Sequence, residues 1–176
     1  MKRYISMFLL LIVCFLLQTT LFQYLKIANV QPNMILVVTA LSGLLYGRKM
    51  GIFIGVICGL LLDLLYGSVV GISILLYLVI GYGNGSANKI YYKEDNLIPM
   101  VSIAASDLIY CILYYICNFL LRGRLHFLTY FKNIMMPEVI YTLLIGSILF
   151  LLMKRLDNWI DPPVEVPLKA KKSYED

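Results

Sequence analysis

The sequence predicts an all-α membrane protein, a bundle of six transmembrane helices. Of its 176 residues, 61% are hydrophobic and only 14% are charged, whereas soluble domains carry about 45–50% apolar and about 25% charged residues. Apolar segments follow one another along the chain without a long polar linker. A soluble core of this length cannot bury so much apolar surface, so the bilayer is the expected solvent.

Six apolar segments mark the expected spans. They cover residues 4–23, 33–46, 50–65, 68–87, 97–121 and 133–153. The first follows Lys2 and Arg3, as a signal peptide would, but it is longer than the ~7–15-residue apolar region of a signal and lacks a small-x-small cleavage site. We therefore expect one membrane domain, residues 1–153, and a polar, disordered cytoplasmic tail, residues 154–176.

The second and third spans are expected to be too short to cross a membrane alone. At about 1.5 Å per residue they cover roughly 21–24 Å of a ~30 Å hydrocarbon core. We expect them to lean on neighbouring helices. The third and fourth spans are separated only by a tight turn around Gly67, which predicts an antiparallel hairpin.

The positions of Lys and Arg predict the orientation. If the N-terminus lies in the cytoplasm, 11 of the 15 Lys and Arg residues fall on the cytoplasmic side and four on the outer side. Basic residues concentrate on the cytoplasmic side of membrane proteins, so both termini are expected there. The basic loop 122–132 departs from this rule, because it falls on the outer side.

The most specific motif is a series of glycines, with one aspartate, that recur every four residues, and we call it the glycine ladder. It consists of Gly51, Gly55, Gly59, Asp63, Gly67 and Gly71. Each step of four drifts by about 40° around a helix, so the first four members share one broad face. Small residues on one face let another backbone approach closely. The ladder is therefore expected either to pack the third span against its own neighbours or to receive a partner's membrane helix.

Three carboxylates lie within the apolar spans, where charges are costly and usually paired or functional. Asp63 is expected to cap the tight turn through backbone N–H groups of residues 66–68, or to contact a ligand or partner. Asp107 lies near the middle of the fifth span and Glu138 one turn into the sixth. These two residues are expected to face a polar cavity or a basic partner residue, or to stabilise the bundle as internally paired or protonated groups.

No constellation of residues predicts catalysis, a cofactor or a metal. His126 is the only histidine, and no cysteine or carboxylate surrounds it in sequence. The four cysteines lie inside apolar runs, where they are expected to act as small packing residues. The net charge of +5 requires no nucleic acid, because basic residues near the cytoplasmic ends of spans suit anionic membrane lipid.

The order of motifs resembles one family, that of the bacterial rod shape-determining protein MreD. The resemblance rests on Pro32-Asn33-Met34, on the segments 47–51 and 59–67, on Gly71 and on Gly81-Tyr82. It implies a subunit of the cell-wall elongation machinery in the cytoplasmic membrane, with no catalytic residues. The implied partners are the single-span protein MreC, the actin-like MreB and the peptidoglycan synthases. The implied fold is similar to the six-helix substrate-binding components of energy-coupling-factor vitamin transporters.

Three functions remain open on these grounds. A non-enzymatic adaptor that binds a partner's membrane helix fits the glycine ladder best. A small-molecule binding or transport subunit would hold Asp63, Asp107 or Glu138 in its pocket, although the first helix lacks the Ala-x-x-x-Ala surface usual in those transporter components, with no alanine in residues 5–18. A lipid-modifying enzyme ranks last, because no convincing nucleophile or carboxylate pair motif is present.

Overall fold

The computed structural model describes residues 2–22, 24–25, 30–67, 70–91, 96–118 and 127–160, and almost all of them are helical. The main helices are α1 (Lys2–Thr20), α2 (Met34–Tyr46), α3 (Arg48–Tyr66), α4 (Ile72–Ala87), α5 (Leu97–Asn118) and α7 (Met136–Ile160). The described residues also form three short elements, the 3-10 helix η1 (Asn88–Ile90), α6 (Phe127–Tyr130) and the π-helical turn η3 (Phe131–Met135). The predicted all-α fold with six main helices is confirmed.

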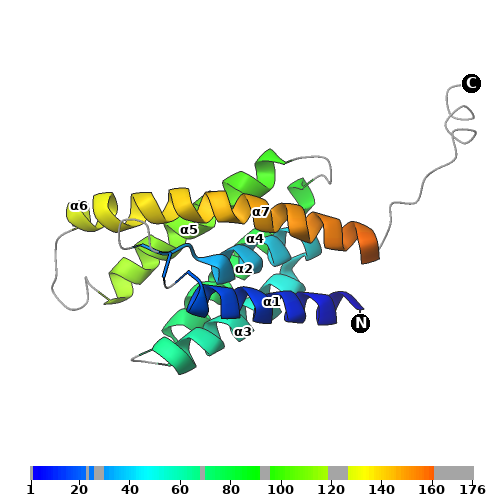
Figure 1. Ribbon diagram of the computed structural model, residues 1–176, viewed down its shortest axis with the longest axis horizontal. Coiled ribbons are helices and arrows are strands. Elements are labelled where there is room, and N and C mark those ends of the chain that lie inside the picture. The colour runs from blue at the N-terminus through cyan, green and yellow to red at the C-terminus, as the bar shows by residue number, and fades with distance from the viewer. Residues whose placement is uncertain are drawn as a thin grey trace, which may run out of the picture.

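The helices pack around α2, which lies between the layers formed by α1 and α3 on one side and α5 and α7 on the other (Figure 1). Helix α1 and helix α7 run in opposite directions, so the start of α1 and the end of α7 lie at the same end of the molecule. This arrangement agrees with an even number of membrane crossings.

The lengths of the helices differ from the expected spans. Within the described residues, three helical segments are long and apolar enough to cross a membrane: Arg48–Tyr66, Leu97–Cys117 and Phe131–Asp157. The expectation of a short third span is therefore wrong, because α3 has 19 residues and reaches about 28 Å. The second span is short as expected, since the 13 residues of α2 reach only about 20 Å.

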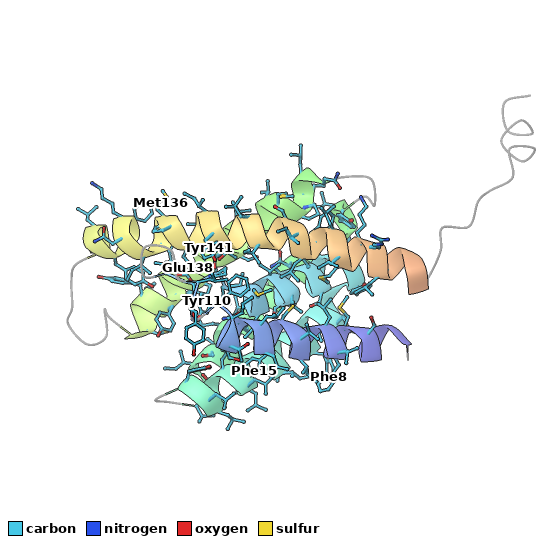
Figure 2. All side chains as sticks on the ribbon, in the orientation of Figure 1. Phe8, Phe15, Tyr110, Met136, Glu138 and Tyr141 are labelled. Carbon is cyan, nitrogen blue, oxygen red and sulfur yellow. The ribbon has the colours of Figure 1, made fainter. Side chains whose placement is uncertain are left out.

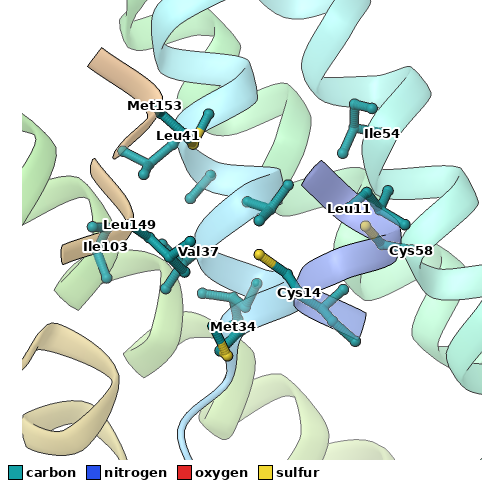
Figure 3. Close-up of a cluster of buried hydrophobic side chains, with 14 of the residues drawn as sticks. Leu11, Cys14, Met34, Val37, Leu41, Ile54, Cys58, Ile103, Leu149 and Met153 are labelled. Carbon is teal, nitrogen blue, oxygen red and sulfur yellow. The ribbon is translucent and has the colours of Figure 1, made fainter. Parts of the chain in front are cut away.

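Burial compensates for the shortness of α2. Every residue from Met34 to Leu44 is buried, and the helix contacts α1, α3, α4, α5 and α7. Figure 3 shows side chains of α2, such as Val37 and Leu41, among core residues of the surrounding helices. A helix enclosed by protein has no lipid-facing surface, so it does not need to match the bilayer thickness.

Because α2 is short, its two ends lie inside the bundle and their backbone groups need partners. At the first turn, Gln18 accepts a hydrogen bond from the backbone N–H of Ile35 at 3.1 Å, and Asn33 caps the helix at 3.2 Å. At the last turn, the side-chain amide of Asn88 donates to the carbonyl of Leu44 at 2.6 Å. Polar side chains from neighbouring segments thus satisfy both ends.

Helices α3 and α4 form the predicted hairpin, and their backbones touch along the glycine ladder. A methyl group added at Gly55 would lie 2.5 Å from the carbonyl oxygen of Tyr77, and one at Gly59 would lie 2.6 Å from the backbone nitrogen of Ile74. Any side chain at these positions would push α4 away. The hairpin therefore requires glycine on this face of α3.

Glycines of three helices meet at the other end of this contact. Methyl groups at Gly51 and Gly81 would each collide with the other residue's carbonyl group, and a methyl at Gly43 of α2 would lie 2.7 Å from the Gly81 oxygen. A methyl at Gly85 would lie 2.7 Å from the backbone nitrogen of Arg48. The structure thus places the helical glycines of the ladder against helices of the same chain.

The last two glycines of the ladder serve the turn between the helices. Gly67 follows the last residue of α3 and accommodates the backbone of Asp63, which lies 2.6 Å from a methyl built there. Gly71 precedes α4 with a φ of 116°, a left-handed conformation that residues with a side chain rarely adopt. These two positions therefore end one helix and start the next.

Several segment boundaries differ from the expected ones. Helix α4 begins at Ile72 rather than at residue 68, and α7 continues past residue 153 to Ile160. Residues 127–132 of the basic loop are helical, whereas residues 122–126, like 161–176 of the tail, lie outside the described residues.

The glycine contacts predict that replacing glycine by alanine has opposite effects on stability at two positions of the hairpin. Gly55→Ala should destabilise the protein by about 1–3 kcal/mol, because the new methyl group overpacks a backbone contact. Gly83→Ala is the matched control: nothing lies within 4 Å of a methyl at Gly83, and alanine favours a helix over glycine by about 1 kcal/mol. Thermal unfolding of the purified variants in detergent measures both effects. Equal stability of the two variants would contradict the prediction.

Candidate functional site

A polar cavity of about 590 Å³ lies at one end of the bundle. Helices α1 and α3 end there, and α2, α4 and α7 begin there. Its polar lining residues are Gln18, Thr19, Gln31, Asn33, Asp63, Tyr66, Ser73, Tyr77, Tyr110, Tyr114, Tyr130 and Glu138. Helix N-termini bring backbone N–H groups and positive partial charge to this end of the molecule.

Asp63, which is only 2% exposed, binds the beginning of α4. Its carboxylate accepts hydrogen bonds from the backbone N–H groups of Gly71 at 2.7 Å, Ser73 at 3.1 Å and Ile74 at 3.3 Å. The expected partners, residues 66–68 of the turn, are thus replaced by the first turn of the next helix. The negative charge lies at a helix N-terminus, where unpaired N–H groups and the helix dipole stabilise it.

A hydrogen-bonded chain of buried groups forms the floor of the cavity. The hydroxyl of Tyr77 donates to the side-chain oxygen of Asn33 at 2.9 Å, and the backbone N–H of Asn33 donates to the hydroxyl of Thr142 at 3.2 Å. The ring of Tyr77 packs edge-on against Tyr110, with centroids 5.4 Å apart. Sequence reasoning missed Tyr77 and Thr142, because hydroxyl groups in apolar runs carry no spacing signal.

The structure brings Asp107 and Glu138 together and adds Cys111 to them. One oxygen or sulfur atom from each of these three side chains lies within 4.8 Å of the others. Glu138 lines the cavity, where Figure 2 shows it beside Tyr110, and Asp107 is fully buried behind the cavity wall. We call these three residues the carboxylate–thiol cluster. Cys111 could have been found from its spacing of four from Asp107, which places both on one helix face.

Asp107 has an unusual environment. Neither of its carboxylate oxygens forms a hydrogen bond of ordinary geometry within the part of the chain that the structure describes, and only the hydroxyl of Thr142 among those residues stabilises the carboxylate. Ser106 and Ser102, its neighbours in sequence, face away from it and bond Asn84 of α4 instead. A buried polar group without a partner is rare in proteins and requires an explanation.

A second concave region, the α4–α5 groove, has a volume of about 570 Å³. It is lined by Leu44, Val79, Ile80, Gly83, Asn84, Ala87, Leu97, Ile98, Val101, Ser102, Ala105, Ser106 and Ile109. Its polar residues bond one another, because the amide of Asn84 donates to Ser106 at 2.7 Å and accepts from Ser102. The groove therefore presents an almost wholly apolar surface.

Comparison with known proteins decides the family. The family model of the rod shape-determining protein MreD matches residues 1–158. The chain belongs to the MreD family. Searches among curated proteins and among solved structures gave no significant match.

Membership of the MreD family establishes a membrane protein that determines rod shape. The matched region includes every main helix up to the last turn of α7, so the bundle, the cavity and the groove all belong to the MreD-like part of the chain. The similarity to transporter substrate-binding components stays a prediction.

Asp63→Asn tests whether this carboxylate acts within the fold. Asparagine keeps one acceptor oxygen and loses the charge, so it cannot hold the N–H groups of Gly71, Ser73 and Ile74 together. We expect a destabilisation of about 1.5–3 kcal/mol, the usual value of hydrogen bonds to charged groups. Thermal unfolding measures it, with Asp157→Asn in α7 as a control for loss of a buried carboxylate elsewhere. A stable Asp63→Asn protein would assign Asp63 to contacts outside the chain.

Proposed function

We propose that this MreD-family chain is a non-catalytic subunit of the bacterial cell-wall elongation machinery that binds the membrane helix of an MreC-like single-span protein. The observation that supports this most is the α4–α5 groove, an apolar depression between two helices of a protein whose family determines rod shape.

The helical glycines of the ladder already pack within the chain. The ladder face of α3 is covered by α4, so a partner helix could reach Gly51, Gly55 and Gly59 only by opening the hairpin. Gly83 differs, because a methyl group there would meet nothing within 4 Å. Glycine weakens a helix by about 1 kcal/mol relative to alanine, and Gly83 gives no packing within the chain in return.

Small residues line both sides of the α4–α5 groove. Gly83 and Ala87 are four residues apart on α4, and Ala105 lies across the groove on α5. Small residues at this spacing let a helix backbone approach closely, which is the main source of helix association in lipid. Asn84 is hydrogen-bonded within the chain, so recognition in this groove would rest on close packing rather than on new hydrogen bonds.

The proposed location is the cytoplasmic membrane, with both termini in the cytoplasm. The position of the two ends of the bundle supports it, because the start of α1 and the end of α7 lie at the same end. The excess of Lys and Arg on that side supports it as well. Peptidoglycan synthases and the filament protein MreB are then the further partners within reach.

Gly83→Leu is expected to abolish co-purification with MreC while the protein stays folded. The leucine side chain would extend into the groove, and its first carbon atom would meet nothing within 4 Å, so the variant should fold. Pull-down of the MreC-like protein from detergent-solubilised membranes measures the effect, and we expect a loss of at least about tenfold, equivalent to roughly 1.4 kcal/mol.

The matched control is Val13→Phe, which adds the same number of carbon atoms to α1. Val13 is 48% exposed and lies outside the groove, so this variant should bind normally. Normal binding by folded Gly83→Leu would remove the groove from the proposal, and loss of binding in both variants would point to a general effect of bulk on the membrane surface.

The proposed topology predicts where reporter fusions are active. A fluorescent protein that matures only in the cytoplasm should fluoresce when it is fused before residue 1 or after residue 176, and alkaline phosphatase should be inactive at both places. A phosphatase inserted near residue 68, in the turn of the hairpin, should be active, because this turn lies at the opposite end. Reversed activities would overturn the orientation.

A further inference from the structure

We propose that the carboxylate–thiol cluster of Asp107, Cys111 and Glu138 is a binding site for a thiophilic divalent metal ion, best matched by Zn²⁺. Asp107 and Cys111 share one face of α5, and Glu138 faces them from α7. The three possible ligand atoms lie within 4.8 Å of one another. Ligand atoms of Zn²⁺ lie about 2.0–2.3 Å from the ion, so small side-chain adjustments would bring these three into one coordination sphere.

The environment of Asp107 is the independent observation that points to a ligand. Its side chain is fully buried and lies against Cys111 and Glu138. Neither oxygen has a hydrogen bond of ordinary geometry within the described residues, and the hydroxyl of Thr142 is the neutral group that stabilises the carboxylate there. Two adjacent buried carboxyl groups cannot both be ionised without a cation between them. A divalent ion would ligate the unpartnered oxygens and neutralise the charges at the same time.

The thiol selects the class of metal. Carboxylates alone would suit Mg²⁺ or Ca²⁺, but a cysteine ligand favours softer ions such as Zn²⁺. Three anionic ligands leave one net negative charge beside a divalent ion. The phenol groups of Tyr110 and Tyr130 interact with Cys111 and Glu138 and are hydrogen-bond donors that would offset that charge.

The polar cavity provides access to the cluster. Cys111 and Glu138 form part of its wall, so an ion can reach them from the end of the bundle without crossing the core. Three protein ligands would leave a fourth coordination position for water, as in zinc sites that stay open on one side. Binding would release the thiol proton of Cys111 into the same cavity.

The backbone before Glu138 supports a specific placement of its side chain. In the π-helical turn η3, the N–H of Met136 donates to the carbonyl of Phe131, five residues back. The next residue, Pro137, has no N–H and its ring would clash with the carbonyl four residues earlier in a regular helix. The extra residue rotates the following helix by about 100°, and such turns often occur at functional sites.

A metal at this position would join α5 to α7 at the mouth of the cavity. This role is separate from the proposed binding of a partner helix, because the α4–α5 groove shares no lining residue with the cavity. The metal site can therefore be tested on the purified chain alone.

The test is a titration of the purified full-length protein in detergent, without an affinity tag, with Co²⁺ as a spectroscopic probe for Zn²⁺. We expect a near-ultraviolet thiolate-to-cobalt band that saturates at one ion per chain and disappears when Zn²⁺ is added. Cys111→Ser should abolish the band. Cys117→Ser, the matched control on the same helix, should keep it. Asp107→Asn should weaken the affinity by more than about tenfold.

Two further measurements keep the outcome decisive. Zn²⁺ should raise the thermal unfolding midpoint, and Mg²⁺ at the same concentration should not. If Cys111→Ser fails to fold, as judged by circular dichroism and gel filtration, Glu138→Gln takes its place and should also weaken Co²⁺ binding by more than about tenfold. Absence of the band in the unmodified protein, a band that persists in folded Cys111→Ser, unchanged affinity of Glu138→Gln, or an equal effect of Mg²⁺ would overturn the proposal.

Discussion

Direct contact between the backbones of α3 and α4 is the constraint on which the rest of the bundle depends. Glycine occurs on both sides of this contact, with Gly55 against Tyr77 on one level and Gly51 against Gly81 on another. Lipid chains are as apolar as side chains, so burial of apolar surface cannot hold two membrane helices together, and close packing must do so. Asp63 closes the contact at its far end by binding the first turn of α4. The hairpin is thus fixed by packing along its length and by charge at its turn.

The position of this hairpin determines which surfaces remain for partners. Because the glycine face of α3 is covered by α4, the feature that is most conspicuous in the sequence is internal. The exposed counterpart is Gly83, on the opposite side of α4 from Gly81 and Gly85, where the groove to α5 begins. Residue spacing alone could not separate these two roles, since one face of α4 carries Gly81 and Gly85 and the other carries Gly83 and Ala87 at the same interval of four.

The sequence predicts what depends on local pattern and fails where long-range contacts decide. The six spans, the hairpin and the start of α2 at Asn33 follow from hydropathy and turn residues. The partners of Asp63 do not, because a carboxylate near a turn can bind the end of its own helix or the start of the next. The sequence predicts a packing role for Cys111, because nothing in it shows that Glu138, on another helix, lies opposite this thiol.

The shortness of α2 links the cavity to the buried charges. A helix of about 20 Å among neighbours that span the membrane leaves a space beyond its first turn, and Gln31 and Asn33, which precede α2, line the polar cavity there. The polar groups that satisfy the free N–H groups of α2 make this space hydrophilic. Carboxyl groups such as Glu138 are tolerated in the bundle because they border this space rather than lipid. Asp107, one layer deeper, does not border this space, and within the described helices only the hydroxyl of Thr142 stabilises its carboxylate, without a hydrogen bond of ordinary geometry.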